Sequence, residues 1–248
     1  MDPFSFPALA SVLDFASTAL TGLTSLLEPI TGPLAAASAV VVVTLLVRVA
    51  LIPVGVAQAR AEQARARLAP KLRLLQQRHR HDRERLQRET MQLYRNERVS
   101  PFAGCLPLLA QAPVVGLLYT VFIRPTIAGH PNPLLHEQLF GVPLGDSLVG
   151  TIATGAIALT DVAVFGGVIA LIALVGELTR RAFRPTTEPD AAMPMPAGMI
   201  GALQFATAAV AVFVPLAAGV YLAVTVTWTL VQRVLLRRRY PLDPARSR

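Results

Sequence analysis

The chain is poor in charged residues and in cysteine, and both shortages restrict the class of protein that it can be. Only 15% of its 248 residues are charged while 53% are hydrophobic, and soluble domains carry roughly a quarter charged residues. Its one cysteine, Cys105, excludes an intramolecular disulfide framework. Because no Lys or Arg precedes Arg48 and no Cys occurs in the first 100 residues, we expect neither the basic start of a signal peptide nor a lipid-modified N-terminal cysteine.

The sequence contains long apolar runs, and its basic residues are grouped beside them. The runs Leu34 to Ile52 and Phe102 to Ile123 are each about the ~20 residues that a helix needs to cross a bilayer. Lys and Arg gather beside such runs on the cytoplasmic side of membrane proteins. Here 21 of them lie between residues 60 and 98, between 180 and 184 or after 232, whereas 1–33 and 125–160 contain none. We therefore expect the N-terminus outside and the C-terminus in the cytoplasm.

This alternation predicts an all-α polytopic membrane protein with five transmembrane helices. The spans are expected at residues 34–57, 103–124, 161–180, 198–214 and 216–236, with a tight turn at Pro215. The remaining segments are expected to be an external segment 1–33, a cytoplasmic helical hairpin 58–102, an external connector 125–160, a cytoplasmic loop 181–197 and a basic cytoplasmic tail 237–248. The two hairpin helices should meet near residues 79–82.

Residues 8–28 have the pattern of an amphipathic helix. Polar residues recur at three- and four-residue intervals, and leucines and an alanine fill the opposite stripe. The polar set is Ser11, Asp14, Thr18, Thr21 and Ser25. The pattern favours a helix that lies flat at the outer membrane interface, with a sixth crossing as the alternative.

Arg48 is the first candidate for a functional residue because it lies inside an apolar span. It is 12 residues from Arg60, or roughly 18 Å of helix, so its side chain can reach water only part of the way. A charge at that depth usually faces a hydrated cavity or an acidic partner. Asp161 and Glu177 are the available acids, and a hydrated cavity is favoured. Polar residues within the spans that are expected to line it are Thr44, Gln111, Gln204, Thr225 and Thr227.

Motifs of covalent catalysis are missing. The sequence has no Gly-rich phosphate loop, no nucleophile elbow and no paired carboxylates at depth. His79 and His81 beside Asp82 suit a solvated hairpin tip better than a metal site, because no further ligand residue stands nearby. We therefore expect no catalytic residue, no metal and no cofactor.

Several stretches of the sequence resemble the YidC/Oxa/Alb family of membrane protein insertases. Leu46-Val-Arg-Val-Ala-Leu-Ile-Pro53 looks like the first span of that family, and Ser100-Pro-Phe-Ala-Gly-Cys-Leu-Pro-Leu-Leu-Ala-Gln-Ala-Pro113 like its second. The segment 141–144 resembles the stretch before the third span. Pro215 to Gly219 with Tyr221, Trp228 and Gln232 resembles the last hairpin and fifth span. The likeness covers about residues 34–240.

The resemblance implies a non-covalent insertase that takes polar segments of nascent membrane proteins into a hydrated groove. Arg48 and Trp228 would belong to that groove, and the basic hairpin would capture the incoming chain. The implied partners are nascent membrane proteins, the ribosome, a Sec-type translocon and anionic lipids, with no role for DNA. The residues implied for capture are Arg60, Arg65, Arg67, Lys71, Arg73 and Arg78, and those implied for contact with ribosomal RNA or lipid are Arg237, Arg238 and Arg239.

Two other classes remain open. A small transporter or channel could use Arg48 as an anion site, although internal repeats, which transporters often have, are not visible in this sequence. A membrane scaffold could use the hairpin to recruit a partner. Both basic clusters also have a simpler role, because basic residues beside a span set its orientation.

Overall fold

The computed structural model describes residues 7–80, 82–97, 116–117, 119–127, 129–155, 157–183 and 205–241, without the side chains of residues 7–10 and 65. These residues are mostly helical. The α-helices are α1 Pro7–Thr31, α2 Ala35–Ala50, α3 Ile52–Arg78, α4 Arg83–Asn96, α6 Leu148–Ala153, α7 Leu159–Ala182, α9 Ala206–Ala211 and α10 Leu216–Arg239.

Three helical segments of the described chain are long and apolar enough to cross a membrane. They are Ser11–Ala50, Leu159–Ala182 and Leu216–Arg239, with mean hydropathies of 2.2, 2.2 and 1.4. A helical membrane protein is therefore confirmed. The five spans and their orientation stay predictions, since most of 103–124 and the first part of 198–214, residues 198–204, lie outside the described residues.

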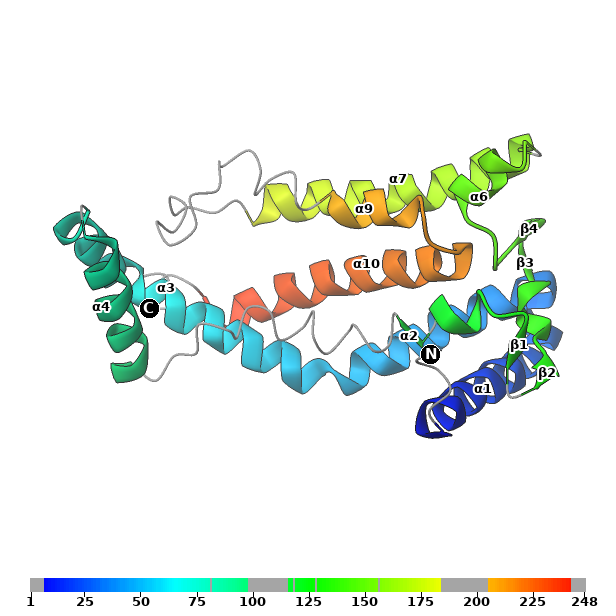
Figure 1. The fold of residues 1–248 in the computed structure, drawn as a ribbon, viewed down its shortest axis with the longest axis horizontal. Helices are drawn as coiled ribbons and strands as arrows, with labels where there is room; N and C mark the ends of the chain where they lie inside the picture. Colours follow the sequence, from blue (N-terminus) through cyan, green and yellow to red (C-terminus); the bar gives the residue numbers. More distant parts are fainter. Residues whose placement is uncertain are drawn as a thin grey trace.

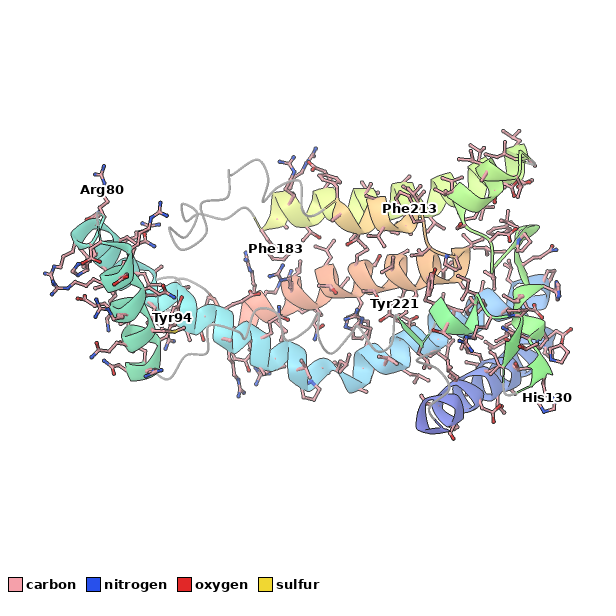
Figure 2. All side chains as sticks on the ribbon, in the orientation of Figure 1. Arg80, Tyr94, His130, Phe183, Phe213 and Tyr221 are labelled. Atoms are coloured by element: carbon pink, nitrogen blue, oxygen red, sulfur yellow. The ribbon has the colours of Figure 1, made fainter. Side chains whose placement is uncertain are left out.

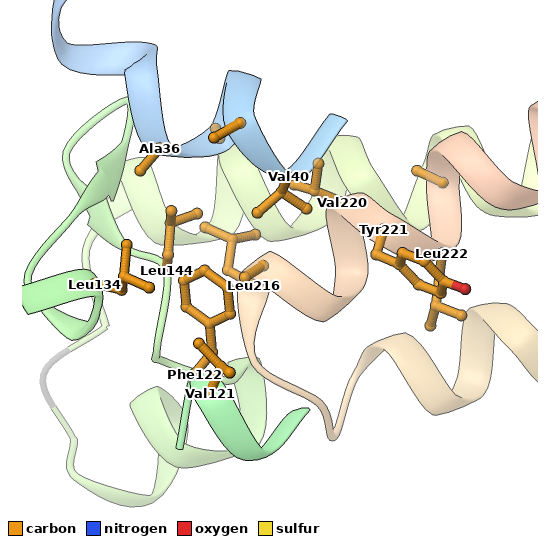
Figure 3. Close-up of a cluster of buried hydrophobic side chains, with 14 of the residues drawn as sticks. Ala36, Val40, Val121, Phe122, Leu134, Leu144, Leu216, Val220, Tyr221 and Leu222 are labelled. Atoms are coloured by element: carbon orange, nitrogen blue, oxygen red, sulfur yellow. The ribbon is translucent and has the colours of Figure 1, made fainter. Parts of the chain in front are cut away.

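Helices α2, α7 and α10 lie side by side, with α10 in the middle (Figure 1). Small residues make this packing close, because they let helix backbones approach each other. Ala36 and Ala39 of α2 and Ala217 of α10 are at most 1% exposed. Figure 3 shows Val40 of α2 beside Val220 of α10 within the buried cluster. We call this set of three helices the trio.

Helix α1 packs obliquely on α2 after a reversal at the short 3-10 helix η2, Gly32–Leu34 (Figure 1). Gly32 has φ +53°, a conformation that L side chains rarely adopt. The predicted stripe is observed: Leu13 and Leu20 are buried, and the polar residues Ser11 to Ser25 are exposed. The apolar stripe therefore covers protein, while large side chains on other faces, such as Phe15 and Ile30, stay exposed.

The first expected span, 34–57, is not one straight helix. Helix α2 ends at Ala50, Leu51 has φ −87° and ψ 4°, and α3 begins at Ile52. Pro53 explains the break, because proline has no N–H to continue the ladder of hydrogen bonds. Two helices lie at the third and fifth expected positions: α7 runs two residues beyond the expected 161–180 at each end, and α10 begins at Leu216 and runs on to Arg239. Arg237 to Arg239 are thus helical rather than part of a separate tail.

The expected external connector is a folded layer, which we call the connector layer (residues 119–155). It contains two short antiparallel hairpins, β1 Thr126–Ile127 with β2 His130–Pro131 and β3 Gln138–Leu139 with β4 Val142–Pro143, joined by the 3-10 helix η4 Pro133–Leu135. Registers pair Ile127 with His130 and Leu139 with Val142. Helix α6 then leads to α7.

Backbone hydrogen bonds join the connector layer to the start of α10. Leu216 donates to the Asp146 carbonyl at 2.8 Å, and Ala217 donates to the Leu144 carbonyl at 3.0 Å. Asn132 is 3% exposed and donates to the carbonyls of Val121 at 2.6 Å and Arg124 at 3.0 Å. The layer therefore closes one end of the trio with buried, hydrogen-bonded structure.

At the opposite end, α3 and α4 form the expected hairpin, which we call the hairpin (Ile52–Asn96). A turn at His79 and Arg80 follows α3, and Asp82 caps α4 by accepting from the Arg85 N–H at 2.9 Å. Lys71 and Glu97 form an ion pair across the two helices. Helix α4 therefore lies only along the second half of α3, which we call its distal part. The first half of α3, which we call its proximal part, contacts α10.

Candidate functional site

Arg48 lies on the inner side of α2 and is only 9% exposed. It follows Thr44 by four residues, so the two side chains share one face of the helix. Thr44 is 1% exposed and donates to the Val40 carbonyl at 2.6 Å. Arg48 is 13 residues from the start of α2 at Ala35, roughly 20 Å of helix. The structure thus places a guanidinium deep between apolar helices.

Helix α10 supplies the polar groups opposite Arg48. Tyr221 is 1% exposed, and its hydroxyl is a hydrogen-bond partner of the Arg48 guanidinium. Thr225, one turn later, is 6% exposed, and its hydroxyl has no hydrogen-bond partner within the described part of the chain. A buried hydroxyl without a partner is costly. Arg48, Tyr221 and Thr225 together form what we call the polar centre.

The two acids that could have neutralised Arg48 are engaged elsewhere. Asp161 accepts from the Ala158 N–H at 2.8 Å at the start of α7. Glu177 accepts from Arg180 and from Arg181 at 2.6 Å, near the end of the same helix. These contacts favour a polar environment for Arg48 over a buried ion pair with α7.

The other residues expected to line a groove are distributed unevenly. Thr227 is exposed and donates to the Ala223 carbonyl at 2.8 Å, so it is not brought to Arg48. Trp228 is half-buried and donates from Nε1 to Gln232 Oε1 at 3.1 Å. Gln111 and Gln204 lie outside the described residues. Of the expected residues, Arg48 and Thr44 are therefore buried on one face of α2 and Thr225 is buried on α10, with Trp228 one turn further along α10.

Polar contacts continue from the polar centre toward the hairpin. The Gln232 amide lies over Gly55 so closely that a Cβ on Gly55 would be 2.2 Å from Gln232 Nε2. Glu62 of α3 accepts from Arg233 of α10 at 2.7 Å. Arg60 donates to the Tyr240 hydroxyl at 3.4 Å and thereby lowers the Tyr240 pKa. The proximal part of α3 is thus fastened to the end of α10.

The basic residues of the hairpin expected to capture a chain are mostly solvent-facing. Those described as exposed are Arg60, Arg67, Lys71, Arg73 and Arg78, and the side chain of Arg65 lies outside the described residues. In the last turn of α10, Arg238 and Arg239 are exposed but Arg237 is half-buried. His79 is buried and pairs with Glu89 at 3.0 Å, so it is a structural residue of the hairpin. No group of three or more metal-ligating residues occurs within the described ranges.

Sequence reasoning missed Tyr221 and Gln232 as site residues, although both were noticed for their resemblance. Their spacing carried a usable signal. Residues 221, 225, 228 and 232 follow the i, i+4, i+7, i+11 pattern of a single helix face, and all four are polar or amphipathic. Gly55 was missed because only the folded structure shows what approaches a glycine.

Comparisons with known proteins agree with this arrangement. The model of the family described as 60Kd inner membrane protein matches residues 26–243. The membrane protein insertase YidC of Azotobacter vinelandii is 36% identical over 85 residues, 34% of this chain and 15% of that protein. The YidC of Clostridium tetani is 36% identical over 84 residues, 34% of this chain and 38% of the relative.

The YidC of Pasteurella multocida is 38% identical over 103 residues, which are 42% of this chain and 18% of the relative. In these alignments the chain spans well under half the length of each relative, 38% at most. The family model, by contrast, covers most of this chain. The chain therefore belongs to the YidC/Oxa/Alb family of inner membrane proteins.

Proposed function

We propose that this protein is a membrane protein insertase that works without covalent chemistry. It takes polar segments of nascent membrane proteins into an intramembrane groove and releases their apolar segments into the lipid. The observation that carries the proposal is the polar centre, in which the buried Arg48 interacts with Tyr221 between apolar helices and Thr225 is buried one turn further along α10. The relatives support it, because each is named an insertase rather than an enzyme.

The physical task of an insertase is to lower a desolvation barrier. Moving a charged tail through dry hydrocarbon costs several kcal/mol or more. A positive charge and hydroxyl groups inside the trio offer that tail replacements for part of its hydration. Asp161 and Glu177 of α7 are engaged elsewhere, and the positive charge of Arg48 would attract acids in an incoming segment. The expected groove would include Thr44, Gln111, Gln204, Thr225, Thr227 and Trp228.

The proposed orientation places the hairpin in the cytoplasm and the connector layer outside. Five spans, at 34–57, 103–124, 161–180, 198–214 and 216–236, would then surround a groove closed by the connector layer. Basic residues near one end of the trio and their absence from residues 125–160 support this direction. Residues 1–33 would lie at the outer interface. The exposed basic residues of the hairpin would capture the chain from the ribosome or from a Sec-type translocon.

Accessibility of single cysteines tests the orientation. Arg80 and His130 are exposed at opposite ends of the molecule (Figure 2). In a Cys105→Ser background, a membrane-impermeant thiol reagent added to intact cells should label His130→Cys and not Arg80→Cys. Labelling of Arg80→Cys from outside would overturn the orientation and, with it, access of the polar centre to newly made chains.

Substitutions in the polar centre test the mechanism. In an insertion assay of a single-span substrate with an acidic N-terminal tail, Arg48→Lys should retain more activity than Arg48→Ala, because charge is what the tail senses. Thr225→Val should lower insertion, whereas Thr160→Val, at the exposed start of α7, is a matched control outside the proposed groove. Equal activity of all these variants would remove the polar centre from the mechanism.

Depletion of the protein separates an insertase from a transporter. Stalled insertion of newly made membrane proteins is the expected result. Accumulation of one small anion with normal membrane protein insertion would instead assign Arg48 to an anion transport site.

A further inference from the structure

A second polar cluster lies where the end of α10 meets the proximal part of α3, and it is separate from the polar centre. It is a small pocket between α3 and α10. The residues that line it include Gly55, Glu62, Gln232, Arg233, Arg237 and Tyr240. Phe183, which ends α7, stands against its basic side chains (Figure 2). We call it the junction pocket.

The junction pocket has more positive charge than its own acid can balance. Glu62 accepts from Arg233 at 2.7 Å, so this carboxylate is already committed. Arg237 stacks on Phe183 with its guanidinium carbon 4.2 Å from the ring centroid, and Arg233 lies 5.4 Å from the same ring. Stacking uses the face of a guanidinium and leaves its N–H edge for another ligand.

Two buried donors in the junction pocket have no acceptor within the described ranges. They are Nε of Arg237 and Nε2 of Gln232. Oε1 of Gln232 accepts a hydrogen bond from the Trp228 indole. Nε2 of Gln232 lies in the space that a side chain at position 55 would fill if Gly55 were another residue. Since an unsatisfied buried donor is costly, a pocket with two of them beside a surplus cation suits an oxyanion ligand.

We propose that the junction pocket binds a phosphate group, with Arg237 and Gln232 as its donors and Arg233 as additional charge. Rotation of the Gln232 amide away from Gly55 would uncover both donors. The phosphodiester of an anionic phospholipid is the favoured source, because the pocket lies beside the basic last turn of α10, a helix long and apolar enough to cross a membrane. Lipid headgroups lie at the ends of such a helix, and basic pockets there bind them. RNA is disfavoured because Arg237 turns inward, whereas Arg238 and Arg239 are exposed.

The fluorescence of Trp228 can report ligand binding in the junction pocket. This residue is the only tryptophan of the chain, and its indole is bonded to Gln232. The intact purified protein in a zwitterionic detergent is titrated with phosphatidylglycerol, with phosphatidylcholine and with inorganic phosphate while tryptophan fluorescence is recorded. A saturable change with phosphatidylglycerol and not with phosphatidylcholine is expected. Saturation by inorganic phosphate at equal affinity would keep the phosphate site but assign it to free phosphate.

Matched variants locate the binding. Arg237→Gln should weaken phosphatidylglycerol binding by about tenfold, the loss expected for one charged hydrogen bond, while Arg238→Gln on the same turn should change it less than about twofold. Arg237→Lys keeps the charge for folding but loses the planar edge, and it should also bind weakly. Equal losses for Arg237→Gln and Arg238→Gln, or tighter binding of a short RNA than of lipid through Arg237, would overturn the proposal.

Discussion

The connector layer and the hairpin close opposite ends of the same trio in opposite ways. In the connector layer, Leu134, Val142 and Leu144 are at most 2% exposed, and Asn132 ties two backbone carbonyls together. In the hairpin, α4 has no buried residue, and ion pairs such as Lys71 with Glu97 hold the helices. One end is therefore sealed by packing, whereas the other is held by exposed charges that solvent and ligands can reach.

This contrast matches the proposed direction of transport. A seal must not open, so burial and backbone hydrogen bonds suit it. A surface that captures and releases a chain needs weak interactions that exchange quickly, and exposed ion pairs contribute only about 0–1 kcal/mol each. Variants that affect one region should thus leave the properties of the other unchanged.

Removal of the distal hairpin should produce the largest functional effect. Lys71 and Glu97 already meet across the hairpin, so residues 72–96 can be replaced by a short Gly-Ser linker with little strain. We expect insertion activity to fall on the order of tenfold, because the capture surface that concentrates substrate is lost. The thermal unfolding temperature of the detergent-solubilised protein should hardly move, since Glu62, Arg233 and the trio remain. Full insertion activity would refute capture by this part of the hairpin.

Asn132→Ala should destabilise the protein most among single substitutions. It leaves the carbonyls of Val121 and Arg124 without their buried donor, at a cost of about 2–4 kcal/mol. Asn96→Ala is the matched control, because Asn96 is exposed at the end of α4, and surface changes usually stay within about 0.5 kcal/mol. Thermal unfolding in detergent measures both. Similar losses for the two variants would show that the connector layer is no tighter than the hairpin.

How far the sequence could predict this architecture depends on the kind of signal. The limits of α7 and α10 were predictable because each is a long, mainly apolar run that ends in arginines. The stripe of α1 was predictable from the spacing of Leu13 and Leu20. The connector layer was not, because its strands are two residues long and so carry no alternating pattern.

The same division holds for the site. Arg48 was visible in the sequence because a charge in an apolar run is costly and rare. Tyr221 was harder to assign, since tyrosine is common both in cores and in polar sites. Gly55 and Arg237 depend on tertiary contacts: a close approach of the Gln232 amide and a stack on Phe183. Contacts of this kind leave no local pattern.

Acid should loosen the hairpin before it affects the connector layer. A hydrogen bond from Arg85, helped by His79, lowers the pKa of Glu89 below its usual range near 4.3. The folded hairpin therefore gains stability from the ionised carboxylate above that usual pKa, and the gain is lost as pH falls through the lowered value. Hydrogen exchange of α4 amides should accelerate below about pH 4, and Glu89→Gln should weaken this pH dependence. An unchanged profile in Glu89→Gln would exclude Glu89 as its source.

The smallest effect is expected at the tip of the β3–β4 hairpin. Phe140 has φ 52° and precedes Gly141 with φ 88°, the positive-φ pair of a type I′ turn, for which Asn-Gly is preferred. Its side chain is 69% exposed, so little packing would be lost on substitution. Phe140→Asn should therefore stabilise the connector layer by about 0.5–1 kcal/mol, while the β-branched Phe140→Val should destabilise it. Unfolding temperatures measured side by side decide the sign, and a lower value for Phe140→Asn than for the parent would mean that the exposed ring makes a stabilising contact with lipid.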